Sequence, residues 1–163
     1  MEKPTWHDYF MGFAYLASSR SHDAQTKVGC VLVSDKKVIS IGYNGFCSGV
    51  DDDSLPSKRP HKYPYMVHAE ENAISNMVIH PPSAVAYITH MPCHRCAKLL
   101  WQNNIRTWYV PIDSVVHGRN IDDQIVYNHL VENGLEIITM LPDLSYLKNI
   151  KDKKNKEEQG ILF

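Results

Sequence analysis

The sequence predicts an α/β fold, a three-layer α/β/α sandwich built on a mixed, mostly parallel five-stranded sheet. Segments with helical apolar spacing alternate with short β-branched runs, and the first two of these runs are adjacent, as in a hairpin. The chain has 163 residues, of which 44% are apolar and 10% aromatic, which is enough for one core but cramped for two. We therefore expect one domain over residues 1–142, followed by a charged segment over 143–163.

The first expected elements are a helix and a strand hairpin. Apolar residues recur with helical spacing over 6–17, and Thr5 with Asp8 resembles a capping box. Two β-branched runs, 28–33 and 38–43, flank a short polar stretch and predict the hairpin. A loop over 44–66 follows, with an acidic run and a basic cluster. Loops of this length in a compact domain are usually functional or disordered.

The second half of the chain alternates helices and strands. Apolar spacing predicts a helix over 67–79, stopped by two prolines, and a strand over 84–89. Pro92 suits the first turn of a helix that runs to 103–104, and a strand is expected over 105–110. A further helix over 121–134 ends at Gly134, and 135–140 forms the last strand. The polar stretch 148–159 cannot bury enough surface to order itself alone, so we expect it to be mobile or docked on a partner subunit.

Charge and hydropathy exclude several classes of protein. Basic and acidic residues number 17 and 18, so no strong field would attract polymeric nucleic acid. The uninterrupted apolar runs fall far short of the ~20 residues that a membrane span needs, and the first residues lack a secretion pattern. The four cysteines then indicate a reducing compartment, with the cytoplasm as the default. We interpret Cys30 and Cys47 as ordinary thiols.

The metal-binding candidates are His68, Cys93 and Cys96, which begin two predicted helices at the same edge of the sheet. The two cysteines share one helical face, where the positive end of the helix favours thiolates. A zinc ion with three protein ligands keeps one position open for water. Cys-x-x-Cys alone is also compatible with a redox pair or half of a structural zinc site. His68-x-Glu70 favours catalysis, because His-x-Glu followed by Pro-Cys-x-x-Cys is the signature of zinc deaminases.

Glu70 is the candidate for proton transfer. Zinc lowers the pKa of bound water to about 7, so hydroxide becomes available without a strong base. A carboxylate beside the metal can take that proton, deliver it to a ring nitrogen and protonate the departing amine. Because Glu70 lies two positions after His68, we expect His68 at the cap of its helix and Glu70 within the first turn.

Several further motifs accompany the zinc ligands: Trp6-x-x-Tyr9-Phe10-Met11, Ser18-Ser19-Arg20-Ser21-x-Asp23-x-x-Thr26-x-Val28-Gly29, Gly42-Tyr43-Asn44-Gly45-Phe46, Asp52-Asp53-x-Leu55-Pro56, Lys62-Tyr63-Pro64-Tyr65-x-x-His68-Ala69-Glu70 and Pro92-Cys93-x-x-Cys96-Ala97-Lys98. With them the sequence resembles the deoxycytidylate deaminase family, within the wider cytidine-deaminase fold, over residues 5–110. The resemblance implies hydrolysis of dCMP to dUMP and ammonia, which supplies thymidylate synthesis. It also implies that Asn44 holds the sugar or base of the nucleotide.

The same resemblance implies assembly and regulation. Members of the family are commonly homo-hexamers, activated by dCTP with magnesium and inhibited by dTTP. Tyr43, Gly45 and Phe46 would then belong to the regulatory site, together with the loop that follows them. A charged loop beside a tight Asn-Gly turn is equally compatible with a plain solvated excursion.

The sequence departs from the family pattern at Ala24, Cys47 and Glu71, none of which touches the zinc chemistry. After the strand expected over 105–110, it also lacks the aromatic residue that many relatives place against the base. In that segment only His117 could stack on a base, while Arg119 could meet phosphate.

Phosphate recognition has four candidates in the sequence, Arg20, Lys27, Arg95 and Arg119, because a dianion in a cleft requires one or two fixed cations. The substrate remains open to a modified cytosine nucleotide or another pyrimidine. A polynucleotide deaminase of the tRNA type would need a basic surface that the composition lacks. A zinc protein without catalytic activity, acting as a regulator or assembly module, would not need the Glu70 carboxylate.

Overall fold

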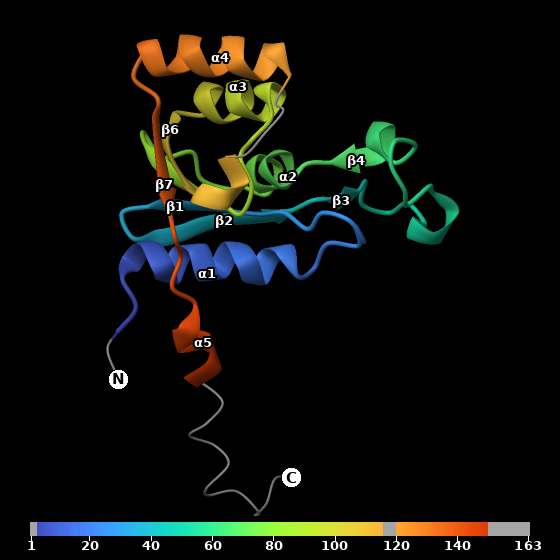
Figure 1. Ribbon diagram of the computed structural model, residues 1–163, viewed down its shortest axis with the longest axis horizontal. Helices are drawn as coiled ribbons and strands as arrows, with labels where there is room; N and C mark the ends of the chain where they lie inside the picture. Colours follow the sequence, from blue (N-terminus) through green and yellow to red (C-terminus); the bar gives the residue numbers. More distant parts are fainter. Residues whose placement is uncertain (1–2, 116–119, 150–163) are drawn as a thin grey trace, which may run out of the picture.

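The secondary structure confirms the alternation of helices and strands (Figure 1). The computed structural model describes residues 3–115 and 120–149. The helices are α1 (Trp6–Ser18), α2 (Ala69–Ser75), α3 (His94–Gln102), α4 (Ile121–Glu132) and α5 (Ser145–Asn149). The strands are β1 (Gly29–Ser34), β2 (Lys37–Tyr43), β3 (Gly45–Phe46), β4 (Met66–Val67), β5 (Ala84–Ile88), β6 (Ile105–Pro111) and β7 (Glu136–Met140). Short 3₁₀ turns are η1 (Asp52–Ser54), η2 (Tyr63–Tyr65) and η3 (Ile112–Val115).

The main sheet is mixed and has five strands in the order β2-β1-β5-β6-β7. β1 runs antiparallel to β2 and β5, whereas β5, β6 and β7 are parallel to one another. Four strands therefore point in one direction and β1 opposes them, because the hairpin reverses the chain before the helical crossovers begin. α1 covers one face, and α2, α3 and α4 lie on the other, with α4 outside α3 (Figure 1). This confirms the three-layer α/β/α architecture.

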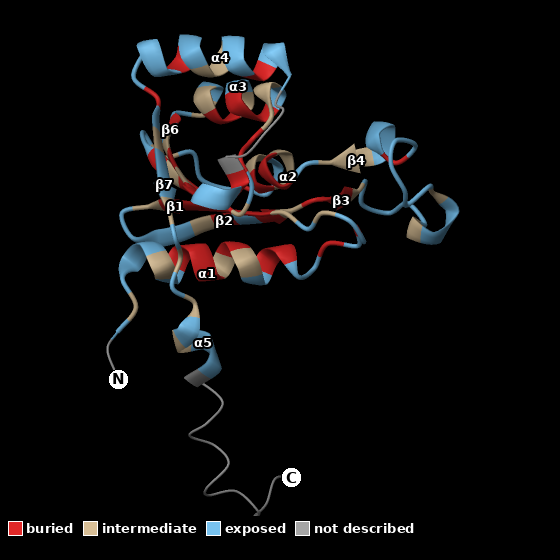
Figure 2. Cartoon of the chain, viewed as in Figure 1, coloured by how far each residue is buried: buried red, intermediate tan, exposed pale blue. Residues whose placement is uncertain are grey.

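Two buried cores lie on opposite faces of the sheet (Figure 2). The core beneath α1 contains Phe10, Met11, Ala14, Val31, Val33 and Tyr87. The larger core lies against α2, α3 and α4 and includes Leu32, Ala86 and Trp108. Because successive strand residues point to opposite faces, β1 and β5 supply side chains to both cores.

Gly42 in β2 determines how closely α2 approaches the sheet. A Cβ atom at this position would lie 2.2 Å from the carbonyl oxygen of Ala69 and 2.3 Å from the amide nitrogen of Ala73. Both are backbone atoms of α2, so the contact requires glycine. The Asn72 side chain also ties α2 to β2, because its Nδ2 donates to the carbonyl oxygen of Tyr43 at 2.6 Å.

The helix α2 is shorter than the helix predicted over 67–79. It begins after His68 and ends at Ser75, where Asn76 follows as the C-cap residue. The Asn76 side chain donates to a carbonyl oxygen of β2 at 3.1 Å, and Val78 is 90% exposed. Met77 is still buried in the larger core, but Val78 and Ile79 are exposed and do not continue a helical face, although their spacing predicted one.

The loop expected over 44–66 contains local structure. It includes η1, η2 and the short strand β3, which pairs antiparallel with β4. A buried ion pair joins the Lys62 ammonium to the Asp23 carboxylate before β1, and both side chains are less than 5% exposed. The loop is thus anchored to the domain at its C-terminal end.

The segment after β7 continues beside α1. The backbone N–H of Asp143 donates to the carboxylate of Asp8 at 2.9 Å, and the Tyr146 hydroxyl donates to the Asp8 carbonyl oxygen at 3.2 Å. The remainder of the expected tail, 150–163, lies outside the described residues, so the boundary at 142 stays a prediction. Among the helices of the described ranges, none is long and apolar enough to cross a membrane.

Candidate active site

Three potential metal ligands converge where α2 and α3 begin. His68 is the N-cap residue of α2, Cys93 is the N-cap residue of α3, and Cys96 lies in the first turn of α3. The His68 Nδ1 atom is 3.6 Å from the Cys93 Sγ and 3.4 Å from the Cys96 Sγ. Tetrahedral zinc, with Zn–S near 2.3 Å and Zn–N near 2.0 Å, would separate nitrogen from sulfur by about 3.5 Å. The geometry and donor set therefore fit zinc, and three ligands leave a fourth position open.

The electrostatics of the ligands favour a bound cation. Hydrogen bonds with Cys96 and His68 lower the pKa of the Cys93 thiol to about 3. The hydrogen bond with Cys93 conversely raises the pKa of the Cys96 thiol, so Cys96 keeps its proton in the metal-free site. A divalent metal would replace that proton and favour both thiolates.

Glu70 lies inside the same site, within the first turn of α2. Its side chain is buried, and the residue is 3% exposed. Burial raises the pKa of its carboxyl to about 7 in the metal-free site, because desolvation penalises the charged form. A carboxyl group that titrates near neutrality can both accept and return a proton.

The positions of the ligands are fixed by neighbouring side chains. The Glu71 carboxylate accepts the backbone N–H of His68 at 2.7 Å and so caps α2. On the other side, the Asp123 carboxylate accepts the backbone N–H of His94 at 2.6 Å and lies 3.0 Å from the His94 Nδ1. The Tyr127 hydroxyl donates to the carbonyl oxygen of Pro92. Thus α4 holds both residues that flank Cys93.

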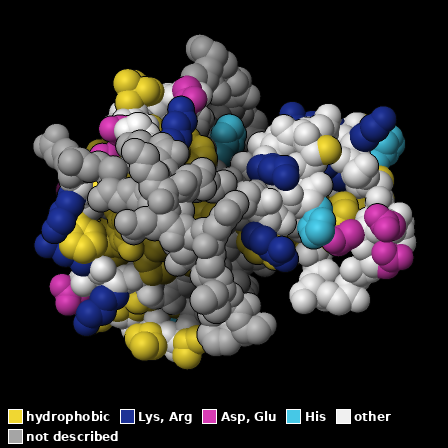
Figure 3. Space-filling view, turned by 90° about the horizontal axis from the view of Figure 1, so that it is seen from below, with side chains coloured by type: hydrophobic (Ala, Val, Ile, Leu, Met, Phe, Trp, Pro, Cys, Tyr) yellow, Lys and Arg dark blue, Asp and Glu magenta, His cyan; other side chains and the backbone are white. Residues whose placement is uncertain are grey.

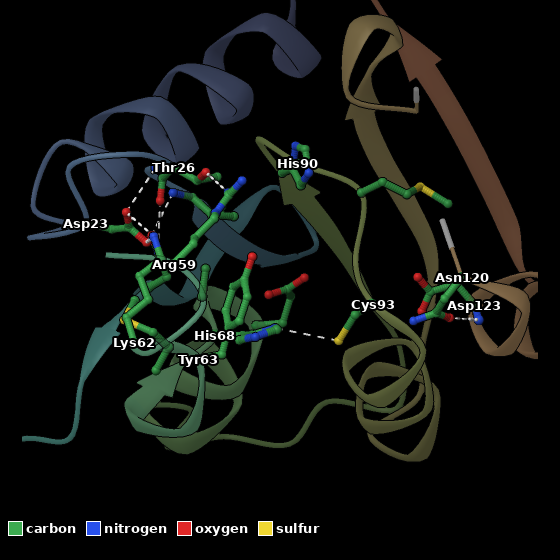
Figure 4. Close-up of a pocket in the computed structure, with 16 residues that line it drawn as sticks. Asp23, Thr26, Arg59, Lys62, Tyr63, His68, His90, Cys93, Asn120 and Asp123 are labelled. Atoms are coloured by element: carbon green, nitrogen blue, oxygen red, sulfur yellow. Dashed lines mark hydrogen bonds and ion pairs between the residues drawn. The ribbon is translucent and has the colours of Figure 1, made fainter. Parts of the chain in front are cut away.

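A cavity of about 430 Å³ opens over these residues (Figure 4). Its volume lies within the range of small-molecule sites. Its lining residues come from the segment before β1, from the long loop and from the starts of α2, α3 and α4: Asp23, Thr26, Val28, Asn44, Arg59, Lys62, Tyr63, Met66, His68, Ala69, Glu70, His90, Met91, Cys93, Asn120 and Asp123. The potential metal site therefore lies in a pocket that could admit a nucleotide.

The structure brings some of the expected substrate residues to this pocket. Asn44 lines it and is buried; its Oδ1 accepts the Val28 N–H at 2.7 Å, and its Nδ2 donates to the Thr26 carbonyl oxygen at 2.9 Å. Lys27 is exposed and is absent from the described lining. His117 and Arg119 lie outside the described residues.

The expected regulatory residues lie next to the pocket. Gly45 and Phe46 form β3 and line a smaller hollow that also includes Lys62. Tyr43 is the last residue of β2, and its carbonyl oxygen accepts the hydrogen bond from Asn72 that holds α2. A hydrogen bond therefore links the end of β2 directly to the helix that carries Glu70.

Sequence reasoning missed the charged residues at one end of the pocket. The Lys62 Nζ lies 2.6 Å from one carboxylate oxygen of Asp23 and 2.5 Å from the other. Burial opposes ionisation of Asp23, but hydrogen bonds from Lys62 and from the backbone N–H groups of Gln25 and Thr26 outweigh it and lower its pKa. The Arg59 guanidinium donates to Thr26 Oγ1 at 2.5 Å. The basic cluster was visible in the sequence, but these partners lie more than 30 positions away.

Comparison with known proteins agrees with this geometry. Residues 4–112 match the family described as the cytidine and deoxycytidylate deaminase zinc-binding region. The chain belongs to this family. It is 41% identical to deoxycytidylate deaminase of Homo sapiens over 109 residues, which cover 62% of this chain and 61% of that protein. The chain thus spans about three fifths of the length of such curated relatives.

Viral deaminases match over their whole length. Deoxycytidylate deaminase of Mycobacterium phage D29 is 32% identical over 132 residues, covering 70% of this chain and 100% of that protein. The crystal structure of dCMP deaminase from cyanophage S-TIM5 in complex with dCMP and dUMP has a TM-score of 0.66 and 26% identity, covering 86% of this chain and 100% of that one. Membership of the deoxycytidylate deaminase family, predicted from the motifs, is confirmed.

Proposed function

We propose that the chain hydrolyses dCMP to dUMP and ammonia and so supplies thymidylate synthesis. The observation that carries the proposal is the buried Glu70 carboxyl beside the convergent His68, Cys93 and Cys96 side chains at one end of a nucleotide-sized pocket. The relatives that carry the name deoxycytidylate deaminase support the choice of substrate.

The proposed mechanism assigns each proton to Glu70. Zinc held by His68, Cys93 and Cys96 supplies an activated water when bound. Glu70 accepts a proton from that water and delivers it to N3 of the cytosine ring. It then takes the remaining proton of the attacking water from the oxygen on C4 and transfers it to the amino group as the C4–N4 bond breaks and ammonia leaves. The oxygen of water remains on C4, so water and dCMP are converted into dUMP and ammonia.

The first experiment is an absorbance assay of the purified, zinc-loaded chain on dCMP, CMP, deoxycytidine and 5-methyl-dCMP. Selective turnover of dCMP supports the proposal. Preference for 5-methyl-dCMP or another pyrimidine would assign the chain to a modified-base or different pyrimidine substrate. No turnover of any of them would favour a silent zinc protein or a polynucleotide substrate.

Glu70→Gln tests the mechanism directly, because the amide keeps the shape of the side chain and cannot accept the proton. We expect zinc content and melting temperature to stay near those of the wild type, while kcat falls roughly 10²- to 10⁴-fold. Wild-type turnover in this variant would refute the role of Glu70.

Assembly and regulation form a finer part of the proposal. We propose a homo-oligomer, a hexamer by resemblance, with dCTP and Mg²⁺ as activator and dTTP as inhibitor acting through Tyr43, Gly45 and Phe46. Exposed apolar side chains on the α1 side, including Trp6 at 51% and Leu16 at 65%, support self-association (Figure 3). The loop after β3 forms a projecting lobe that carries both basic and acidic side chains, and its basic side chains suit an anionic effector (Figure 3). We place the chain in the cytoplasm, where its thiols stay reduced.

Light scattering with and without dCTP and Mg²⁺ tests this part separately from catalysis. A stable oligomer whose activity rises with dCTP and falls with dTTP is expected. A monomer that responds to neither nucleotide would refute it.

A further inference from the structure

The pocket has two chemically different ends. Figure 4 shows Asp23, Thr26, Arg59 and Lys62 on one side of His68, and Cys93 on the other. The His68 and Cys93 end contains the groups that fit a metal, whereas the opposite end contains two permanent cations. Of these two cations, the one without an acidic partner is the better candidate to bind an anionic ligand.

Lys62 is already neutralised. Its ammonium contacts both oxygens of the Asp23 carboxylate, and the two side chains are 3% and 4% exposed. A ligand that displaced this contact would leave a buried carboxylate without its partner, which is strongly unfavourable. Lys62 therefore anchors the loop rather than binding the substrate.

Arg59 differs from Lys62 in this respect. Its guanidinium donates to Thr26 Oγ1, a neutral acceptor that leaves the positive charge uncompensated. Among the described residues, no carboxylate lies within ion-pair distance of Arg59. It is thus the permanent cation of the described lining whose charge faces the pocket without an acidic partner.

The surroundings of Arg59 hold it in place before any ligand arrives. Its backbone N–H donates to Gln25 Oε1 at 3.2 Å, and the Lys62–Asp23 pair fixes the loop three residues later. Asp23 in turn accepts the N–H groups of Gln25 and Thr26, so the segment that contacts Arg59 is itself ordered by hydrogen bonds. Preorganisation of this kind reduces the entropy that a ligand must overcome on binding.

The position relative to Asn44 indicates which part of a ligand Arg59 meets. Asn44 Nδ2 donates to the carbonyl oxygen of Thr26, and Arg59 contacts the hydroxyl of the same residue. A nucleotide with its base at the metal and its sugar near Asn44 would place its phosphate beside Thr26. A guanidinium fork matches the oxygens of a phosphate monoester.

We propose that Arg59 binds the 5′-phosphate and makes the enzyme select a nucleotide over the free nucleoside. This inference rests on the proposed deamination of a cytosine nucleotide. It assigns phosphate recognition to a residue of the long loop rather than to Lys27.

The test compares Arg59→Gln with the wild type on dCMP and on deoxycytidine, using the zinc-loaded full chain. We expect kcat/KM for dCMP to fall roughly 10- to 100-fold, mainly through KM, as for loss of a charge-assisted hydrogen bond. For deoxycytidine the change should stay within about twofold. Arg59→Lys should recover part of the loss, because it restores the charge without the fork.

Lys58→Gln is the matched control. Lys58 is the adjacent residue, is exposed and is absent from the described lining, so its removal deletes the same charge without touching the pocket. Wild-type kinetics are expected. An equal loss on both substrates in Arg59→Gln, or an equal loss in Lys58→Gln, would overturn the proposal.

Calorimetric binding of dUMP and deoxyuridine separates this inference from the proposed reaction. If the wild type binds dUMP in an Arg59-dependent manner but deaminates nothing, the proposed function fails and the phosphate site stands. If the wild type deaminates dCMP and Arg59→Gln binds dUMP equally well, the phosphate site fails and the function stands. A variant altered only in its response to dCTP would assign Arg59 to an effector and overturn the inference.

Discussion

Replacing Gly42 by alanine should damage the active site through the backbone of α2. The new Cβ would lie 2.2 Å from the Ala69 carbonyl oxygen, and ordinary contact begins at 3.4 Å, so α2 must retreat by about 1.2 Å. Overpacking of this kind costs about 1–3 kcal/mol. For a chain of this length, 2 kcal/mol lowers the melting temperature by roughly 4–8 °C.

The retreat of α2 should reduce kcat by more than the loss of folding stability would explain, because it displaces catalytic side chains. His68 and Glu70 begin this helix, and a displacement near 1 Å costs about 10²-fold in rate. We therefore expect kcat on dCMP to fall about 10²-fold in zinc-loaded Gly42→Ala, with weaker zinc binding in chelator competition. Circular dichroism melts provide the stability measurement.

Gly45→Ala, assayed without dCTP or dTTP because Gly45 belongs to the proposed effector site, is the matched control, since a Cβ at Gly45 meets nothing within 4 Å. Gly29→Ala provides a second comparison: its Cβ would lie 1.9 Å from the Ala14 carbonyl oxygen of α1, a helix that supplies no residue to the described pocket lining. It should lose stability with a smaller effect on kcat. A Gly42→Ala protein with the melting temperature and kcat of the wild type would refute the steric argument.

Three further substitutions test the surroundings of the site. Asp123→Ala removes the acceptor of the His94 N–H, so zinc affinity should fall about 10- to 100-fold in chelator competition. Asp123→Asn keeps an acceptor oxygen and should lose less affinity. Equal zinc affinity in the wild type and both variants would contradict a positioning role for Asp123. Asp23→Ala leaves Lys62 buried without its partner and should cost about 3–5 kcal/mol in urea unfolding. Because the folded pKa of Asp23 is lowered, its stabilisation is complete above the unfolded pKa near 4 and is lost as pH falls below it, a loss that Asp23→Asn should not show. Glu71→Ala removes the cap on the His68 N–H and should cost about 1 kcal/mol in thermal melts, and an unchanged melting temperature would argue against the cap.

The parts of the fold that repeat a local pattern could be predicted from the sequence. β1 and β2 lie within about one residue of the expected runs, because β-branched residues flank a short polar turn. The length of α2 was overestimated because the helical apolar spacing that predicts it continues to residue 79. In the structure the helix ends at Ser75, and the Asn76 side chain donates a hydrogen bond to β2. The pairing of β3 with β4 involves two residues on each side, too few for any periodicity to show.

The residues of the candidate site likewise differ in whether local sequence spacing could predict them. His68 with Glu70, and Cys93 with Cys96, are separated by two and three positions, so the helix starts alone bring each pair to one place. Arg59 reaches Thr26 across 33 positions through a loop that has no regular spacing. Asp123 shows only as a residue in the first turn of a predicted helix, and nothing in its spacing indicates that it holds His94.

This division separates the determinants of chemistry from those of selectivity. The groups proposed for the reaction depend on two helix N-termini: α2 packs closely against the sheet at Gly42, and the start of α3 is held by Asp123 of α4. The proposed phosphate contact depends on a loop fixed by the Lys62–Asp23 pair. Loop substitutions that keep this pair can therefore change which nucleotide is accepted while the proton transfers at Glu70 continue, whereas substitutions beneath α2 affect every substrate alike.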